Sequence, residues 1–161
     1  MNRWVVDAGP LIFLAKLDRL DLLRVRGNVY APRGVFAETQ AYMDEAAQAI
    51  ANATKTWLQI VNAEDHLAVE LLLADFHRGE AEVIVLAREL HADWVVLDDM
   101  KARRFARRLG LPVVGTVGLL LSAKLRGEIP SLQDEVRRLQ SLGFWISSGL
   151  VEKALDAAGE R

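Results

Sequence analysis

Two short apolar runs, each ending in aspartate, constrain the fold of this chain more than any other feature. In residues 94–98 four apolar residues follow one another without polar alternation, and the run ends in Asp98, with Asp99 directly after it. Such runs are typical of strands buried on both faces of a parallel sheet. Residues 3–7 end in the same way, at Asp7. Because open α/β sheets bind ligands at the carboxyl ends of their strands, we expect these acidic ends to mark a functional site.

Length and composition indicate one ordinary globular domain. The chain has 161 residues, of which 52% are hydrophobic and 26% are charged, and its net charge is −2. A chain of this size buries a large core. We therefore expect a single domain over residues 1–161, with a core of about residues 1–126 and a helical extension over about residues 127–161.

Missing residue types and patterns disfavour several classes of protein. With no cysteine, the chain has no disulfide, no thiolate zinc site and no cysteine nucleophile. Residues 109–121 are interrupted by glycine and proline and do not form a membrane span, and the amino terminus lacks a signal-peptide pattern. We therefore expect a cytoplasmic protein. Its small net charge means that any contact with nucleic acid needs a local basic patch.

Strands and helices are expected to alternate along the chain. Strands are predicted at residues 3–7, 28–31, 94–98 and 111–114, the last at or near a sheet edge because of Pro112, whereas residues 57–61 fit either a strand or a helix end. The helices expected between and after them cover residues 10–17, 33–53, 64–76, 79–90, 101–109, 116–126, 131–142 and 150–158, and a further short helix is expected directly after Asp18. Asp18 and Thr116 are predicted helix caps. This order predicts an α/β fold, a three-layer α/β/α sandwich with a central parallel sheet and extra C-terminal helices.

Two glutamates stand near buried helix faces and are further candidates for the site. Glu38 shares a helix face with a valine three residues earlier, and Glu80 lies nearer to the packed side of its helix than Glu82 does. Taken singly, each has a simpler explanation. A glutamate on a surface helix is usually solvated, and an acidic residue in a first helical turn is favoured by the helix dipole.

A convergence of Asp7, Glu38, Glu80 and Asp98, with Asp99 beside them, would require a cation. Two carboxylates about 4 Å apart repel by roughly 4 kcal/mol at an effective dielectric constant near 20. Four of them stay ionised together only with a cation nearby, and otherwise their pKa values rise strongly. Carboxylate oxygens select Mg²⁺ or Mn²⁺, and the three histidines lack the spacing of zinc ligands. An ion held in this way polarises a phosphodiester and lowers the pKa of bound water.

The strongest basic patch directly follows the second acidic strand end. It consists of Lys101, Arg103, Arg104, Arg107 and Arg108. A solvated helix face is the simpler explanation of such a run, but cations beside an acidic cluster also suit the phosphate backbone of a nucleic acid. The chain has no Walker loop and no GxGxxG, HExxH or GxSxG motif, so nucleotide-dependent phosphoryl transfer, dinucleotide binding and serine hydrolysis lack sequence support.

The order of these motifs resembles that of the PIN-domain nucleases, and more closely that of their DUF3368 branch. The motifs are VVDAGPLI at residues 5–12, VFAE at 35–38, GEAE at 79–82 and VLDD at 96–99, and the ending ALDAAGE at 154–160 also looks like that branch. The resemblance covers nearly the whole chain. It implies a PIN-like α/β/α fold and a metal-dependent endoribonuclease that hydrolyses RNA phosphodiester bonds as the toxin of a toxin–antitoxin pair.

The resemblance also implies site residues and partners. The family's four catalytic acids fall, in chain order, on Asp7, Glu38, Glu80 and Asp98. Together with Asp99 they would bind Mg²⁺ or Mn²⁺, while an alignment shifted along the chain would choose Glu82 and Asp99 in place of the last two. The five cations of residues 101–108 would bind RNA. The partners implied are an RNA substrate, a small antitoxin protein and a second copy of the chain in a homodimer.

Two other classes of function stay open. PIN domains commonly have serine or threonine just after the first aspartate, whereas this chain has Ala8 and Gly9 there and offers a hydroxyl only elsewhere, for example at Thr116. A degenerate PIN-like module that binds RNA or protein without cutting is therefore one alternative. The other is a receiver-type phosphoacceptor domain, which needs an acid pair at the first strand, where only Asp7 stands.

Overall fold

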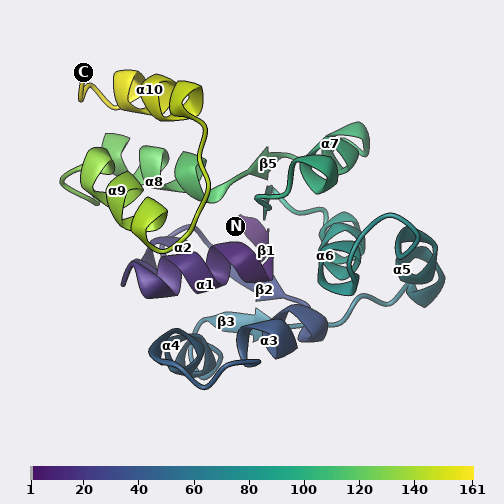
Figure 1. Cartoon of the computed structure of the whole chain (residues 1–161). Helices are drawn as coiled ribbons and strands as arrows, with labels where there is room; N and C mark the ends of the chain where they lie inside the picture. The colour runs from purple at the N-terminus through teal and green to yellow at the C-terminus, as the bar shows by residue number, and fades with distance from the viewer. Residues whose placement is uncertain (1) are drawn as a thin grey trace.

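The protein is built on a central parallel sheet. A computed structural model describes residues 2–161, in which five parallel strands are ordered β3-β2-β1-β4-β5 (Figure 1). The strands are β1 (Arg3–Val6), β2 (Asn28–Ala31), β3 (Leu58–Ile60), β4 (Trp94–Val96) and β5 (Val113–Val114). The four predicted strands are confirmed, with β5 at the edge as Pro112 indicated. Residues 57–61, which fit either a strand or a helix end, contain the strand at the opposite edge, β3.

The central strand, β1, marks the place where the chain reverses its direction across the sheet. From β1 the chain continues to β2 and β3 on one side, and it then crosses back to form β4 and β5 on the other. Trp4 of β1 accordingly pairs with Val29 of β2 and with Trp94 of β4. Such a reversal opens a crevice at the carboxyl ends of the two strands that flank it. Here these strands are β1, followed by Asp7, and β4, followed shortly by Asp98.

Helices cover both faces of the sheet. They are α1 (Ala8–Lys16), α2 (Asp21–Arg24), α3 (Arg33–Thr39), α4 (Glu45–Ala53), α5 (His66–Leu72), α6 (Arg78–Glu89), α7 (Met100–Arg108), α8 (Thr116–Leu125), α9 (Leu132–Ser141) and α10 (Ser148–Ala157). Right-handed crossovers place α1 and α6 on opposite faces of the central strands (Figure 1). Val5 and Val95 are fully buried between the layers. The predicted three-layer α/β/α sandwich is therefore confirmed.

The helix predicted over residues 33–53 is two helices. α3 ends at Thr39, and α4 begins only after Asp44, whose carboxylate accepts a hydrogen bond from the Ala47 N–H at 2.8 Å. An aspartate N-cap satisfies backbone donors that otherwise lack partners, so it favours a new helix start over continuation of the first helix. The connection leaves Tyr42 and Met43 exposed.

Two predicted helix caps are also corrected. Asp18 has a positive φ of 58° and donates its backbone N–H to Ala15, so it ends α1, and Leu20 is the N-cap of α2. Aspartate adopts this left-handed conformation more readily than most residues do. Thr116 is the first residue of α8, after the N-cap Gly115, and its side chain contacts Asp98 instead.

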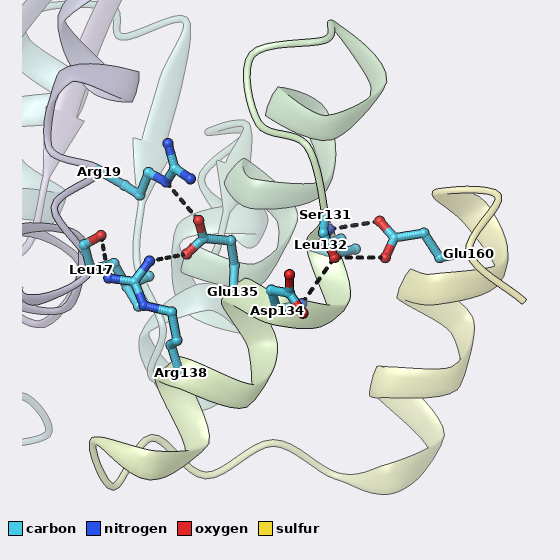
Figure 2. Close-up of polar contacts among 8 residues, drawn as sticks. All are labelled: Leu17, Arg19, Ser131, Leu132, Asp134, Glu135, Arg138 and Glu160. Atoms are coloured by element: carbon cyan, nitrogen blue, oxygen red, sulfur yellow. Dashed lines mark hydrogen bonds and ion pairs between the residues drawn. The ribbon is translucent and has the colours of Figure 1, made fainter.

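Two carboxylates, shown in Figure 2, hold the C-terminal helices in place, one by a contact with Arg19 and the other by contacts within the group. Glu135 of α9 is only 2% exposed and accepts hydrogen bonds from Arg19 at 2.6 Å and from Arg138 at 3.0 Å. Near the end of the chain, Glu160 accepts hydrogen bonds from the first backbone N–H groups of α9, including that of Leu132 at 2.6 Å. Helices α8, α9 and α10 therefore form one packed group. Within residues 2–161, none of the helices has the length and apolarity required to span a bilayer.

Candidate active site

Asp7 lies at the centre of the acidic end of the sheet. Its backbone N–H donates a hydrogen bond to the Val96 carbonyl at 3.1 Å, which fixes the end of β1 against β4. Burial raises the pKa of the Asp7 carboxyl from 3.8 to about 7, partly offset by the Ala8 N–H and strengthened by the charges of three acids, Glu80, Glu38 and Asp98. Each of these carboxylates is therefore close enough to act on Asp7. The structure therefore places the other three predicted acids within the range of charge interaction of Asp7.

Glu38 and Glu80 reach this site from two packed helices, α3 and α6. The Glu38 carboxylate lies over Gly79, where a Cβ atom would collide with it. Glu80 stands one residue further on, in the first turn of α6, and accepts a hydrogen bond from the His77 N–H at 3.2 Å. Partial burial and the charges of Glu80 and Glu82 raise the pKa of Glu38, although His77 opposes the rise. Glu80 thus caps its helix and also acts on Asp7 through its charge. Its position at the start of α6 is therefore compatible both with stabilisation of the helix dipole and with a role in the acidic site.

Glu82 and Asp99, the two residues of the shifted alignment, have other contacts. Glu82 lies over Gly34 of α3, and its Oε1 atom is buried with no hydrogen-bond partner within residues 2–161. The Asp99 carboxylate accepts a hydrogen bond from the Ala102 N–H at 2.9 Å and caps α7. Neither acid is among those whose charge raises the pKa of Asp7. The geometry therefore favours Glu80 and Asp98, while a metal-binding role for Asp99 stays a prediction.

Asp98 is held by Thr116, which the sequence analysis predicted to be a helix cap. The Thr116 backbone N–H donates to Asp98 Oδ1 at 2.8 Å, and its hydroxyl donates to Oδ2 at 2.6 Å. Burial raises the pKa of Asp98, whereas both Thr116 bonds and the Arg103 charge lower it. Thr116 is completely buried. Thr116 therefore supplies a hydroxyl to a site whose first aspartate is followed by Ala8 and Gly9. The sequence indicates this role only through the position of Thr116, two residues after the edge strand β5.

The five predicted RNA-binding cations do not form one uniform surface. Arg103 turns inward, its guanidinium lying over Gly115 beside Asp98. Lys101 Nζ is 3.8 Å from the Asp75 carboxylate and 5.2 Å from the centre of the Phe76 ring. The three remaining side chains are exposed on α7 and have no ion-pair partner within residues 2–161: Arg104, Arg107 and Arg108.

The donor set suits a divalent cation. Carboxylate oxygens are the ligands of Mg²⁺ and Mn²⁺, and three acids close to the largely buried Asp7 carry a cost that a cation removes. The glycine at position 79 leaves the space that the Glu38 carboxylate occupies. In the part of the chain that the structure describes, however, no three histidine or acidic side chains lie close enough together to hold a metal ion. Glu38, Glu80 and Asp98 lie instead within the range of charge interaction of Asp7, and two of them also bond to the protein, Glu80 to His77 and Asp98 to Thr116.

Fold and site together define an α/β domain with a convergent acidic centre at its topological switch point. The family model of the PIN domain, DUF3368, matches residues 3–160, and the chain therefore belongs to the PIN-domain family. This confirms the resemblance seen in the sequence motifs. PIN domains are generally nucleases and typically use divalent metal ions. No curated protein matches the chain.

Proposed function

We propose that this protein is a divalent-metal-dependent endoribonuclease that hydrolyses phosphodiester bonds of RNA. The observation that carries the proposal is the state of Asp7, whose pKa is raised to about 7 by burial and by the charges of Glu80, Glu38 and Asp98. A protein gains no stability by gathering three acids around a largely buried carboxyl group. Such an arrangement is understandable when a cation joins it, and perturbed carboxylates in a crevice are typical of functional sites.

Asp7, Glu38, Glu80 and Asp98 would hold Mg²⁺ or Mn²⁺. When bound, such an ion supplies Lewis-acid chemistry, polarising the phosphodiester and lowering the pKa of water. Asp7 retains a proton up to about pH 7 in the metal-free protein and loses it when a cation makes the charged form favourable. Thr116 fixes both oxygens of Asp98, so this ligand needs no reordering. Arg103, beside Asp98, places a positive charge where a phosphate would approach.

The biological setting is proposed on family membership alone. We propose that the protein is the cytoplasmic toxin of a toxin–antitoxin pair, that a small antitoxin protein inhibits it and that it forms a homodimer. A monomeric mass by light scattering contradicts the dimer. Growth that is unaffected by expression of the wild-type protein contradicts the toxin role.

RNA cleavage with and without metal tests the nuclease activity directly. We expect the wild type to cleave RNA with Mg²⁺ or Mn²⁺ and to be inactive in EDTA, and we expect Asp7→Asn to be inactive throughout. Asp21→Asn is the matched control, since Asp21 is an exposed aspartate at the start of α2. Equal cleavage by the wild type and Asp7→Asn disproves the proposal.

A PIN-like module that binds RNA or protein without cutting is the second candidate. Two observations favour it: Ala8 and Gly9 replace the usual hydroxyl residue, and within residues 2–161 the acids do not yet form a closed metal-binding group. Titration calorimetry with Mn²⁺ separates the two functions. Retained RNA affinity without any heat of metal binding supports the non-cutting module.

A further inference from the structure

A large cleft begins at Asp98 and extends away from the acidic centre. It has a volume of about 710 Å³, and its floor is formed by β5 and the start of α8, including Gly115 and Gly118. Its other wall is formed by the connection between α9 and α10 and by α10 itself. In Figure 1 this connection runs alongside α8 on the side of β5. The C-terminal helices therefore add a second wall beside the candidate active site.

The walls of the cleft are mainly apolar, and one of them presents a flat aromatic ring. Trp145 lies on the α9–α10 connection and is 82% exposed. Its neighbour Phe144 is held in place by an edge-on contact with Phe13 of α1, with ring centres 4.9 Å apart. Met100 and Leu150 are also exposed in the same cleft. An exposed tryptophan beside a fixed aromatic residue is an open stacking surface.

The charges that line the cleft are almost all positive. Arg103, Arg107 and Lys153 contribute to it, and Asp98 is its one acid among the described residues. None of the three cations has an ion-pair partner within residues 2–161, and Arg103 Nε is buried with no hydrogen-bond partner in that range. Unpaired cations on an apolar cleft favour an occupant that is both anionic and flat.

Single-stranded nucleic acid has this combination of properties. Each nucleotide carries a flat base that stacks on aromatic side chains and a phosphate that pairs with cations. A duplex hides its bases, and an apolar peptide would leave the cations unpaired. The volume also lies in the range of small-ligand sites, so it admits a nucleotide. We propose that this cleft binds a nucleotide of single-stranded RNA next to the phosphate presented to the acids, with its base against Trp145 and its phosphate toward Arg103 and Arg107.

This inference rests on the proposed function for the identity of the nucleic acid, and its test is a binding measurement that needs no cleavage. Fluorescence anisotropy in EDTA would follow a labelled single-stranded oligouridylate, the same length of duplex RNA and a strand with abasic positions. We expect the first to bind most tightly. Trp145→Ala should weaken single-strand binding by about 5- to 100-fold, whereas Trp145→Phe should retain most of the affinity because phenylalanine also stacks. Tyr42→Ala, at the exposed α3–α4 connection, is the aromatic control and should change nothing.

The cationic part of the cleft is tested by salt dependence. Arg107→Ala should weaken binding to all strands alike and lower the slope of log affinity against log salt by about one. Arg24→Ala, which removes an exposed arginine on α2, is the matched control. Equal binding of single and double strands, or an unchanged affinity in Trp145→Ala, overturns the proposal and leaves the cleft to a protein partner. Cleavage in Mn²⁺ is scored separately: activity with no role for Trp145 refutes the cleft alone, and Trp145-dependent binding without cleavage refutes the nuclease alone.

Discussion

Replacing Asp7 by asparagine should stabilise the metal-free protein while it abolishes metal-dependent activity. The Asp7 carboxyl is buried and faces three other acids, so its pKa is about 7 in the folded protein against 3.8 for an ordinary aspartate. The folded protein therefore favours the neutral group. Asparagine is neutral at every pH, has nearly the same shape and keeps an oxygen that accepts hydrogen bonds.

The size of the effect follows from proton linkage. A raised pKa in the folded state contributes stability that is fully present below the unfolded pKa of 3.8 and is lost as the pH rises through about 7. The shift of about three units corresponds to about 4 kcal/mol at pH 8 and about 2 kcal/mol at pH 5. Asp7→Asn escapes this loss. Since 1 kcal/mol shifts Tm by about 2 to 4 °C in a domain of this size, the variant should melt on the order of 10 °C higher at pH 8.

Thermal unfolding in EDTA, followed by circular dichroism at pH 5 and pH 8, measures the difference. Asp99→Asn is the stability control on the same edge of the sheet, because asparagine caps a helix as well as aspartate does. Added Mn²⁺ should raise the Tm of the wild type and leave that of Asp7→Asn nearly unchanged. A stability gain of equal size at both pH values, or none at pH 8, refutes the conclusion that burial and the neighbouring acids disfavour the charged form of Asp7.

Three further predictions test other parts of the structure. Gly79→Ala places a Cβ where the Glu38 carboxylate lies, so calorimetry should show an affinity for Mn²⁺ lower by about 10-fold or more. Glu135→Gln leaves two arginines beside a buried neutral group, and urea unfolding should show a loss of about 3 kcal/mol. Thr116→Val removes the hydroxyl that lowers the pKa of Asp98, so the acidic limb of the pH–rate profile should move to higher pH.

Each of these changes has a matched control elsewhere in the chain. Gly9→Ala adds a Cβ to the first turn of α1, where no atom lies within 4 Å, and should leave the affinity for Mn²⁺ unchanged. Glu152→Gln breaks an exposed ion pair and should cost less than about 1 kcal/mol. Thr54→Val removes a hydroxyl that bonds only to the Ala51 carbonyl. Equal effects in a variant and its control would contradict the corresponding assignment.

Strong local signals made the sheet and its acidic edge predictable. The apolar runs of β1 and β4 are typical of strands buried on both faces of a sheet. The acids that follow them therefore lie at the carboxyl ends of parallel strands. The spacing of Glu38 and Glu80 along their helices, close to buried positions, indicates that they belong to the site. The structure adds the reason for their closeness, since Gly79 lets the Glu38 carboxylate approach the first turn of α6.

Contacts between distant segments decide the features that sequence reasoning missed. The break between α3 and α4 is an exception, because it depends on a local cap at Asp44 within a stretch whose composition suits one continuous helix. Thr116 caps nothing because the Asp98 carboxylate, at the end of another strand, binds its hydroxyl. Arg103 turns inward because Gly115 leaves room for its guanidinium. Residue type and spacing do not encode such pairings until the strand order is known.

The central position of β1 also affects how the protein is made. Synthesis runs from the amino terminus, so the first strand of this sheet to leave the ribosome is the one that needs partners on both sides. β2 is synthesised soon after β1. Val6, however, cannot pair with Val96, and the Asp7 N–H cannot bond to the Val96 carbonyl, until β4 has been synthesised. A nascent chain that stops before β4 lacks Asp98 and has an open edge along its middle strand. Any activity of the acidic centre therefore begins only after the second half of the polypeptide has been translated and has inserted beside the first.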